Sequence, residues 1–250
     1  MENHRRSSVI GSTAAPYETR IAASCGTASD YRSVGAPSLP NYIGATSGGT
    51  QGIVDDASPS SHPLTVDNLF RQVRSAGGSA RSYAESMPGA CVLTGSGRYA
   101  VKHNPAAYYE GGIDRSECRR EIVPLGGLSG SFETAVTHDE LPTFTVIVPD
   151  LCDDTHNCPV SQGDRWLMRW LGRILGGPTY AKGSTVVFVV WDEPTPMPFL
   201  AIAPTIKGGT VVGIPIDHYA LLRTTEDLLG LRVHLGTART APSLRGPLGI

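Results

Sequence analysis

Long apolar runs and lysine residues are both scarce in this 250-residue chain. A membrane-spanning helix needs about 18 or more consecutive apolar residues, and no stretch comes near that length, so the sequence predicts no transmembrane segment. Lysine occurs only at positions 102, 182 and 207, and the net charge is −2, which argues against a broad nucleic-acid-binding surface. With 40% apolar and 18% charged residues the chain is not typical of disorder. We therefore expect a globular protein with its own hydrophobic core.

Several well-known motifs are also missing. The chain has no P-loop, no H-E-x-x-H and no C-x-x-C pattern, and the first residues, MENHRRSSVIGS, lack the apolar segment of a signal peptide. Five cysteines are present, at positions 25, 91, 118, 152 and 158. The pairs Cys152 with Cys158 and Cys91 with Cys118 are spaced so that each could close a loop, which would indicate an oxidising compartment. The alternative is five buried thiols.

Continuous β-branched runs predict the central strands. Residues 143–150 (TFTVIVPD) and 184–193 (STVVFVVWDE) are typical of strands buried on both faces of a parallel sheet. Between them, 164–175 has the pattern of a helix closed by two glycines, and 198–206 predicts a third strand. The fold class is therefore α/β, with a mostly parallel central sheet and helices on both faces.

The rest of the chain is less regular. The first 60 residues are rich in Gly, Ser and Pro and predict loops with short helices. A helix is expected from a capping Thr65 to Gly77, and another after a capping Asp217. We predict one domain over 1–250, in which the loop-rich segment 88–141 is an insertion or cap.

Acidic residues and histidines follow the predicted strands, where ligands collect in α/β sheets. The first strand leads to Asp153 and His156, the second to Asp192 and Glu193, and His218 begins the last helix. Adjacent carboxylates repel each other unless a cation compensates, so Asp192 and Glu193 suggest a hard-metal site. The alternatives are solvated turn residues for this pair and a polar loop for Asp153 and His156.

Ser38 precedes Leu39, Pro40 and Asn41 at the predicted start of a short helix that ends at Gly48 and Gly49. Free N–H groups and the helix dipole favour an anion there, so a phosphate beside Ser38 would be well placed. The alternative is an ordinary helix-capping serine. The segment GATSG at 44–48 resembles a nucleophile elbow with threonine at its centre, but no strand leads into it, which disfavours an acyl hydrolase.

Seven segments together resemble one family, in the same order along nearly the whole chain: MENH (1–4), PSLPNY (37–42), TSGGTQG (46–52), VKHNP (101–105), PDLCDDTH (149–156), VWDE (190–193) and DHYALLRTTE (217–226). They look like the phosphoesterase family of bacterial acid phosphatases and non-haemolytic phospholipases C, within the alkaline-phosphatase superfamily. The resemblance implies an alkaline-phosphatase-like fold. Family members carry an apolar strand before the MENH-like motif, so the chain as given is expected to lack the first core strand, which we expect upstream.

The resemblance also implies roles for residues. Ser38 would be the nucleophile, and His156 and His218 the candidate proton donors. The residues implied for substrate binding and for metal binding share Asn3. The implied substrate-binding residues are Asn3, Asn41, Lys102 and His103; the implied metal ligands are Glu2, Asn3, Ser38, Asp153, Asp192 and Glu193. The remaining histidines, His4, His62, His138 and His234, are expected to be structural or exposed.

The predicted function is a hydrolase of phosphoric esters, either an acid phosphatase or a phospholipase C-like enzyme, which uses a divalent metal ion and a phosphoserine intermediate. The expected partner is a small phosphate ester or a phospholipid, with no nucleic acid as a stable partner. One alternative is a catalytically impaired phosphate- or phospholipid-binding protein on the same scaffold, and a less favoured one is a serine acyl hydrolase. The resemblance implies a secreted or cell-surface protein, whereas a genuine start at Met1 would imply a cytoplasmic one.

Overall fold

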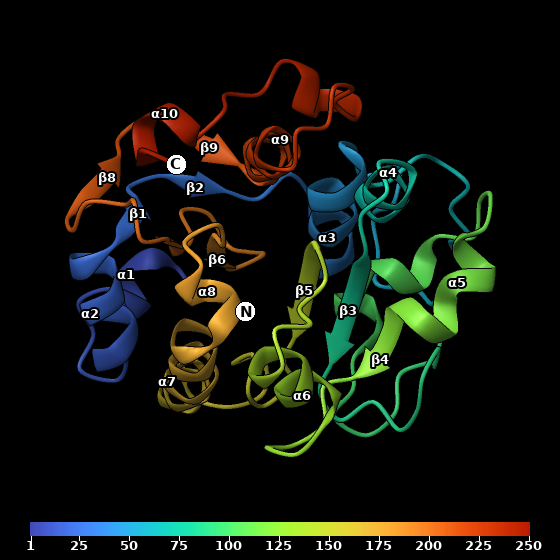
Figure 1. Cartoon of the computed structure of the whole chain (residues 1–250), viewed down its shortest axis with the longest axis horizontal. Coiled ribbons are helices and arrows are strands. Elements are labelled where there is room, and N and C mark those ends of the chain that lie inside the picture. The colour runs from blue at the N-terminus through green and yellow to red at the C-terminus, as the bar shows by residue number, and fades with distance from the viewer.

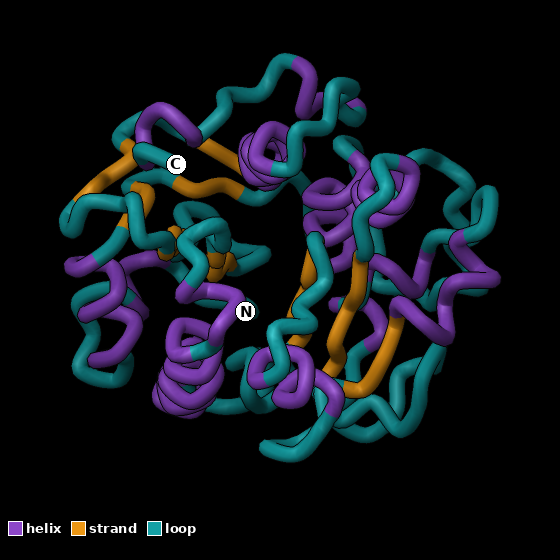
Figure 2. The backbone as a smooth tube through the Cα atoms, in the orientation of Figure 1, coloured by secondary structure: helices purple, strands orange, loops and turns teal.

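The computed structural model describes residues 1–250 and contains three groups of paired strands (Figures 1 and 2). The first has the order β6 (Val187–Val190), β7 (Phe199–Ile202), β1 (Gly26–Ala28), β8 (Thr210–Val212); the second β4 (Ile122–Pro124), β3 (Ala80–Ala84), β5 (Phe144–Val148); the third β2 (Tyr31–Arg32), β9 (Ile216–Asp217). Pairing is parallel throughout the second and third groups and between β1 and β8, while β7 is antiparallel to both neighbours. The predicted α/β class is confirmed.

The predicted central sheet is divided between β5 and β6, which belong to different groups. No strand pairs with the outer edge of either, and the N-terminus lies between them (Figure 1). The Met1 ammonium donates to the carbonyl of Val190 at 3.1 Å, and Glu2 N–H donates to the carbonyl of Asp154 at 2.8 Å. Residues 1–3 therefore join the loop after β5 to the end of β6 and carry Glu2 to that edge.

The helices surround these sheets: α1 (Arg6–Val9), α2 (Pro16–Ser24), α3 (Ser38–Ser47), α4 (Leu69–Ser75), α5 (Asp114–Glu121), α6 (Ser131–Thr137), α7 (Val160–Gly176), α8 (Pro178–Ala181), α9 (His218–Leu228) and α10 (Arg245–Leu248), with 3₁₀ turns η1 (Val101–His103), η2 (Pro105–Tyr108) and η3 (Gly236–Arg239). The predicted helix at 164–175 is α7, which buries Trp166, Trp170 and Leu171 in the larger core cluster. No helix is long and apolar enough to cross a bilayer.

The helix caps confirm one prediction and correct another. Asp217 caps α9, since its side chain accepts from the N–H groups of Tyr219 (2.9 Å) and Ala220 (3.0 Å). Thr65 does not cap α4. That helix begins later, and Asn68 is the cap, accepting from Arg71 N–H at 3.0 Å. The interpretation failed because asparagine caps helices at least as well as threonine and both precede the apolar pattern.

Segment 88–141 is joined closely to the second sheet. It supplies β4, which pairs with β3, and α6, which packs in the larger core cluster through Phe132. The first 60 residues contain, besides short helices, the strands β1 and β2, which the sequence did not predict because they are only three and two residues long.

Two disulfides are present, and they are the pairs suggested by the cysteine spacing. The Cα atoms are 5.2 Å apart in Cys91–Cys118 and 4.7 Å apart in Cys152–Cys158, while Cys25 is free. The second disulfide closes the loop that follows β5 and thereby constrains the residues between its cysteines.

Candidate active site

Ser38 is the first residue of α3, and the loop before it is held by one side chain. Asn41 accepts hydrogen bonds from Val34 N–H (2.8 Å) and Gly35 N–H (3.0 Å) and donates to the carbonyls of Gly35 (3.0 Å) and Pro37 (3.2 Å). Both ends of the amide are therefore engaged with the backbone. Asn41 fixes the turn that presents Ser38 at the helix start.

Glu2 is the nearest acidic neighbour of Ser38. The Ser38 hydroxyl donates to Glu2 Oε2 at 3.1 Å, and the Tyr42 hydroxyl donates to Glu2 Oε1. Glu2 is fully buried, and burial raises its pKa well above the ordinary value, with the negative charge of Asp192 adding to the effect. The carboxyl group is thus buried beside the serine, in surroundings that already hold another negative charge.

Asp192 follows β6 and lies near enough to Glu2 for its charge to act on the Glu2 carboxyl group. It is buried, its Oδ2 atom has no hydrogen-bond partner, and Oδ1 lies 3.4 Å from the N–H of Asn3. Asn3 is exposed and has a φ of +57°, a left-handed conformation that asparagine tolerates better than most residues. Burial raises the pKa of Glu193, and the negative charge of Asp192 raises it further.

His103 and His156 are further neighbours of Glu2. His103 is buried; its Nδ1 pairs with Asp154 Oδ2 at 3.0 Å, and its Nε2, which has no hydrogen-bond partner, lies 3.4 Å from Glu2 Oε2. Burial lowers the pKa of His103 despite Asp154. One ligand atom each from Glu2, His103 and His156 lie within 4.8 Å of one another. The Tyr42 ring stacks on His103 at 5.3 Å between centroids.

His218 is placed differently from the other two histidines. Its Nδ1 lies 2.6 Å from the Tyr31 hydroxyl, and its Nε2 lies 3.3 Å from the backbone carbonyl of Asp192. The side chain is buried and burial lowers its pKa. Both ring nitrogens are engaged within the protein, so His218 supports the backbone that carries Asp192.

Lys102 is paired with an acid that the sequence did not single out. Its Nζ donates to Asp56 Oδ2 at 2.7 Å, and the other oxygen of Asp56 accepts from the backbone N–H of Leu39 at 2.9 Å. The carboxylate of Asp56 therefore bridges the lysine and the start of α3, next to Ser38.

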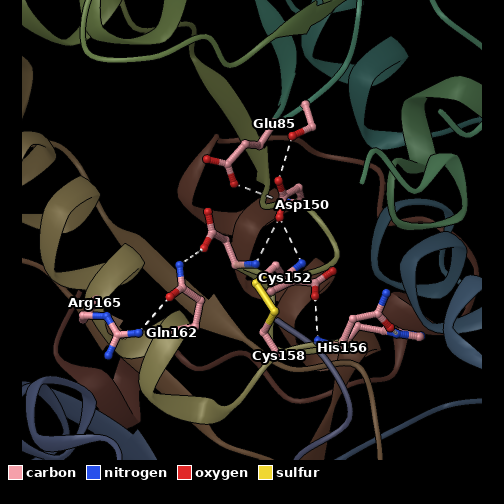
Figure 3. The surroundings of a disulfide bond; sticks show 11 residues. Glu85, Asp150, Cys152, His156, Cys158, Gln162 and Arg165 are labelled. Atoms are coloured by element: carbon pink, nitrogen blue, oxygen red, sulfur yellow. Dashed lines mark hydrogen bonds between the residues drawn. A yellow bond between two sulfur atoms is a disulfide. The ribbon is translucent and has the colours of Figure 1, made fainter. Parts of the chain in front are cut away.

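A second group, the Glu85 cluster, consists of Glu85, Asp150 and Asp153 at the ends of β3 and β5 (Figure 3). Its oxygens accept from protein donors. Glu85 accepts hydrogen bonds from Asp150 N–H and Trp166 Nε1. Asp150 accepts from the Ser86 hydroxyl and from the N–H groups of Cys152 and Asp153. Asp153 accepts from the side-chain amide of Gln162. The structure thus places Asp153 in this cluster, and not among the neighbours of Ser38.

The residues around Ser38 fit a divalent cation. Glu2 and Asp192 are buried carboxylates with no lysine or arginine partner, and Asp192 Oδ2 is unpaired. Lys102, the nearest lysine, is occupied by Asp56. Uncompensated buried carboxylates are costly, and oxygen donors are the ligands that hard cations prefer.

Of the predicted residues, the structure brings Ser38, His103 and His156 to Glu2, and the charge of Asp192 acts on Glu2. Asn3 is exposed and meets Asp192 through its backbone N–H, and Glu193 follows Asp192 in the chain. Sequence reasoning missed Tyr31, Tyr42 and Asp56, and it placed Asp154 in the acidic group after the first strand without giving it a role. Tyr42 and Asp154 lie within the quoted motifs, but nothing in the sequence marks Tyr31 or Asp56. The centre of the GATSG segment, Thr46, lies inside α3, where its hydroxyl bonds to the Tyr42 carbonyl at 2.9 Å.

The fold is that of the alkaline-phosphatase superfamily. A solved protein of that superfamily from Vibrio parahaemolyticus superposes with a TM-score of 0.63 at 13% identity, covering 99% of this chain and 69% of the other. The phosphoesterase family model matches residues 10–232, and the chain belongs to that family. The family match confirms the resemblance inferred from the motifs and supports the predicted class of hydrolase, and the superposition confirms the fold.

Curated relatives agree. A phosphatidylinositol-3-phosphatase of Mycobacterium tuberculosis is 27% identical over 97% of this chain and 79% of its own length. A phosphate-repressible acid phosphatase of Penicillium chrysogenum is 27% identical over 66% of this chain and 40% of its length, and a probable acid phosphatase of Kluyveromyces lactis is 25% identical over 85% and 54%.

Proposed function

We propose that this protein is a metal-dependent phosphoesterase in which Ser38 forms a phosphoserine intermediate. The observation that carries the proposal is the placement of the Ser38 hydroxyl at the start of α3, 3.1 Å from buried Glu2, whose pKa is raised by burial and by the negative charge of Asp192. A nucleophile, an electropositive helix end and two buried carboxylates, one of them with an unpaired oxygen, are then available to one site.

The proposed ligands of the cation are Glu2, Asn3, Ser38, Asp192 and Glu193, and Asp153 is left out because its oxygens belong to the Glu85 cluster. When bound, a divalent cation supplies positive charge that favours the serine alkoxide and offsets the charge of the phosphate. His218 holds the Asp192 backbone, and Asn41 holds the turn before Ser38.

The chain's own residues account for the two chemical steps. The Ser38 hydroxyl passes its proton to Glu2 Oε2, to which it is hydrogen-bonded, and Ser38 Oγ attacks phosphorus. The bond from phosphorus to the ester oxygen breaks, and His156, the less buried histidine of the site, delivers a proton to the departing alcohol. Water then gives a proton to His156 and attacks the phosphoserine, the bond to Ser38 Oγ breaks, Ser38 recovers its proton from Glu2, and phosphate leaves. His103 contacts phosphate oxygens in both steps.

The proposed substrate is a small phosphate ester or a phospholipid, because the relatives are named as an acid phosphatase and a phosphatidylinositol-3-phosphatase. The two disulfides support an oxidising location, such as the cell exterior.

Replacement of the nucleophile tests the proposal. Ser38→Ala should lower turnover of p-nitrophenyl phosphate by about 10³-fold or more, as expected when a covalent nucleophile is removed. Ser47→Ala is the matched control, since Ser47 is buried at the other end of α3 and donates to the Ile43 carbonyl at 2.9 Å. Full turnover in Ser38→Ala would remove Ser38 from the mechanism. Phosphate binding without turnover in the metal-loaded wild type would favour the binding-protein alternative.

A further inference from the structure

The start of α3 has few donors to offer a phosphate. The free N–H groups of a helix lie in its first turn, and in α3 the third residue, Pro40, has none. Ser38 and Leu39 therefore supply the donors nearest the Ser38 hydroxyl. The Leu39 N–H is already bonded to Asp56 Oδ1 at 2.9 Å.

The positive charge beside this helix start is also engaged. Lys102 Nζ donates to Asp56 Oδ2 at 2.7 Å, and both side chains are about one-quarter exposed, so the pair is only partly screened by water. Asp56 and Lys102 both act on the pKa of Glu193, the first raising it and the second lowering it, which places the pair within electrostatic reach of the proposed cation ligands.

A carboxylate that accepts from a helix-start N–H and from an ammonium group makes the contacts that a phosphate oxygen would make there. We propose that the Asp56 carboxylate occupies the phosphate position of the Ser38 site and competes with phosphate groups for Leu39 N–H and Lys102. This inference rests on the proposed function, because it assumes that the phosphate binds beside Ser38.

Competition of this kind has a defined consequence. A substrate gains these two contacts only by displacing Asp56, and the carboxylate returns as the product phosphate departs. Asp56 lies in the irregular segment between α3 and α4, and its own backbone makes no hydrogen bond to another backbone group. The carboxylate therefore weakens the binding of substrate and product alike.

The test measures the affinity for inorganic phosphate by calorimetry, which needs no turnover. Asp56→Asn and Asp56→Ala should bind phosphate about tenfold more tightly than wild type, equivalent to about 1.4 kcal/mol. Asp55→Asn is the control: the neighbouring acid is exposed and pairs with His62 at 2.5 Å, and its replacement should leave the affinity unchanged. Circular dichroism establishes that each variant is folded, and the near-isosteric asparagine serves if the alanine variant does not fold.

Lys102→Met sharpens the result. In wild type Lys102 is paired with Asp56, so Lys102→Met should weaken phosphate binding only a little. In the Asp56→Asn background the lysine is free, and the same substitution should weaken phosphate binding more. Unchanged or weaker phosphate binding in both Asp56 variants would overturn the inference, since Asp56 would then only position Lys102. That outcome is independent of the Ser38→Ala assay, which tests the proposed function by turnover.

Discussion

The chain has two groups of carboxylates at the ends of strands, and their hydrogen-bond partners differ. In the Glu85 cluster, Glu85 and Asp150 accept from backbone N–H groups and a hydroxyl (Figure 3), and Glu85 also accepts from the indole of Trp166. Around Ser38, Asp192 Oδ2 has no partner and His103 Nε2 faces Glu2 without a hydrogen bond.

The difference separates a structural role from a functional one. Carboxylates whose oxygens are supplied with donors are stable in the folded protein by themselves, whereas a buried carboxylate without a donor costs about 1–3 kcal/mol or more unless a ligand compensates. The Glu85 cluster therefore fits a loop anchor, and the group around Ser38 fits a site that a cation completes. The following experiments test this comparison.

Removing one charge should lower activity in the group around Ser38 and leave activity unchanged in the Glu85 cluster. Asp192→Asn is expected to lower kcat/KM by about 10³-fold, about 4 kcal/mol, because it deletes a proposed cation ligand. Asp150→Asn is equally buried, and its amide keeps an acceptor for the two backbone N–H groups and a donor for Ser86. We expect its kcat/KM to stay near wild type. Equal losses of kcat/KM in the two variants, measured with p-nitrophenyl phosphate, would contradict the division into a structural and a functional group of carboxylates.

Cation binding should stabilise the fold through the Ser38 site alone. A ligand at 100 times its dissociation constant adds about 2.7 kcal/mol to the free energy of unfolding. Urea unfolding with and without a chelator should show a gain of this size in wild type and in Asp150→Asn, and none in Asp192→Asn. Without metal, Asp192→Asn should be more stable than wild type because an unpaired buried charge is gone. If metal still stabilises Asp192→Asn, the cation binds at a site that does not include Asp192.

Opening the loop after β5 should affect both groups of carboxylates. The double replacement Cys152→Ser with Cys158→Ser is expected to lower the free energy of unfolding by about 2 kcal/mol and to lower turnover, since Asp154 and His156 lie inside that loop. The control is Cys91→Ser with Cys118→Ser, which opens a longer loop and should cost more stability. Assayed well below both midpoints, the control should retain more turnover; the reverse ranking would contradict the assigned role of the short loop.

The last prediction is a pH dependence of the free energy of unfolding that arises from Glu85. Burial raises the pKa of Glu85 from 4.5 to about 7 in the folded protein. Between these values the folded state holds a proton that the unfolded state has lost, so stability falls as pH rises through this window and the loss is complete above it. Glu85→Gln should flatten that fall, whatever its absolute stability. Parallel curves for wild type and variant, from urea unfolding at pH 5 to 8, would show that Glu85 does not titrate there.

Much of the fold was predictable because its signals are local. The runs that became β5, β6 and β7, the amphipathic α7, and the Asp217 cap all express periodicity or capping within about ten residues. The strands β1 and β2 are too short to give such a signal, and the cap of α4 was ambiguous between two capping residues. The division between β5 and β6 depends on pairing across the chain, which no local pattern reports.

The sequence alone determined the class of fold, the candidate disulfide pairs and a set of motif residues whose type suits phosphate chemistry. Only the tertiary structure decided which of them meet: it joined Glu2 to Ser38 and Asp192 across the sheet edges, assigned Asp153 to a different cluster and engaged both nitrogens of His218. It also brought Asp56 to the start of α3. The physical reason is that hydrogen-bond partnership and burial depend on distances between residues remote in sequence, whereas residue type and spacing constrain only near neighbours.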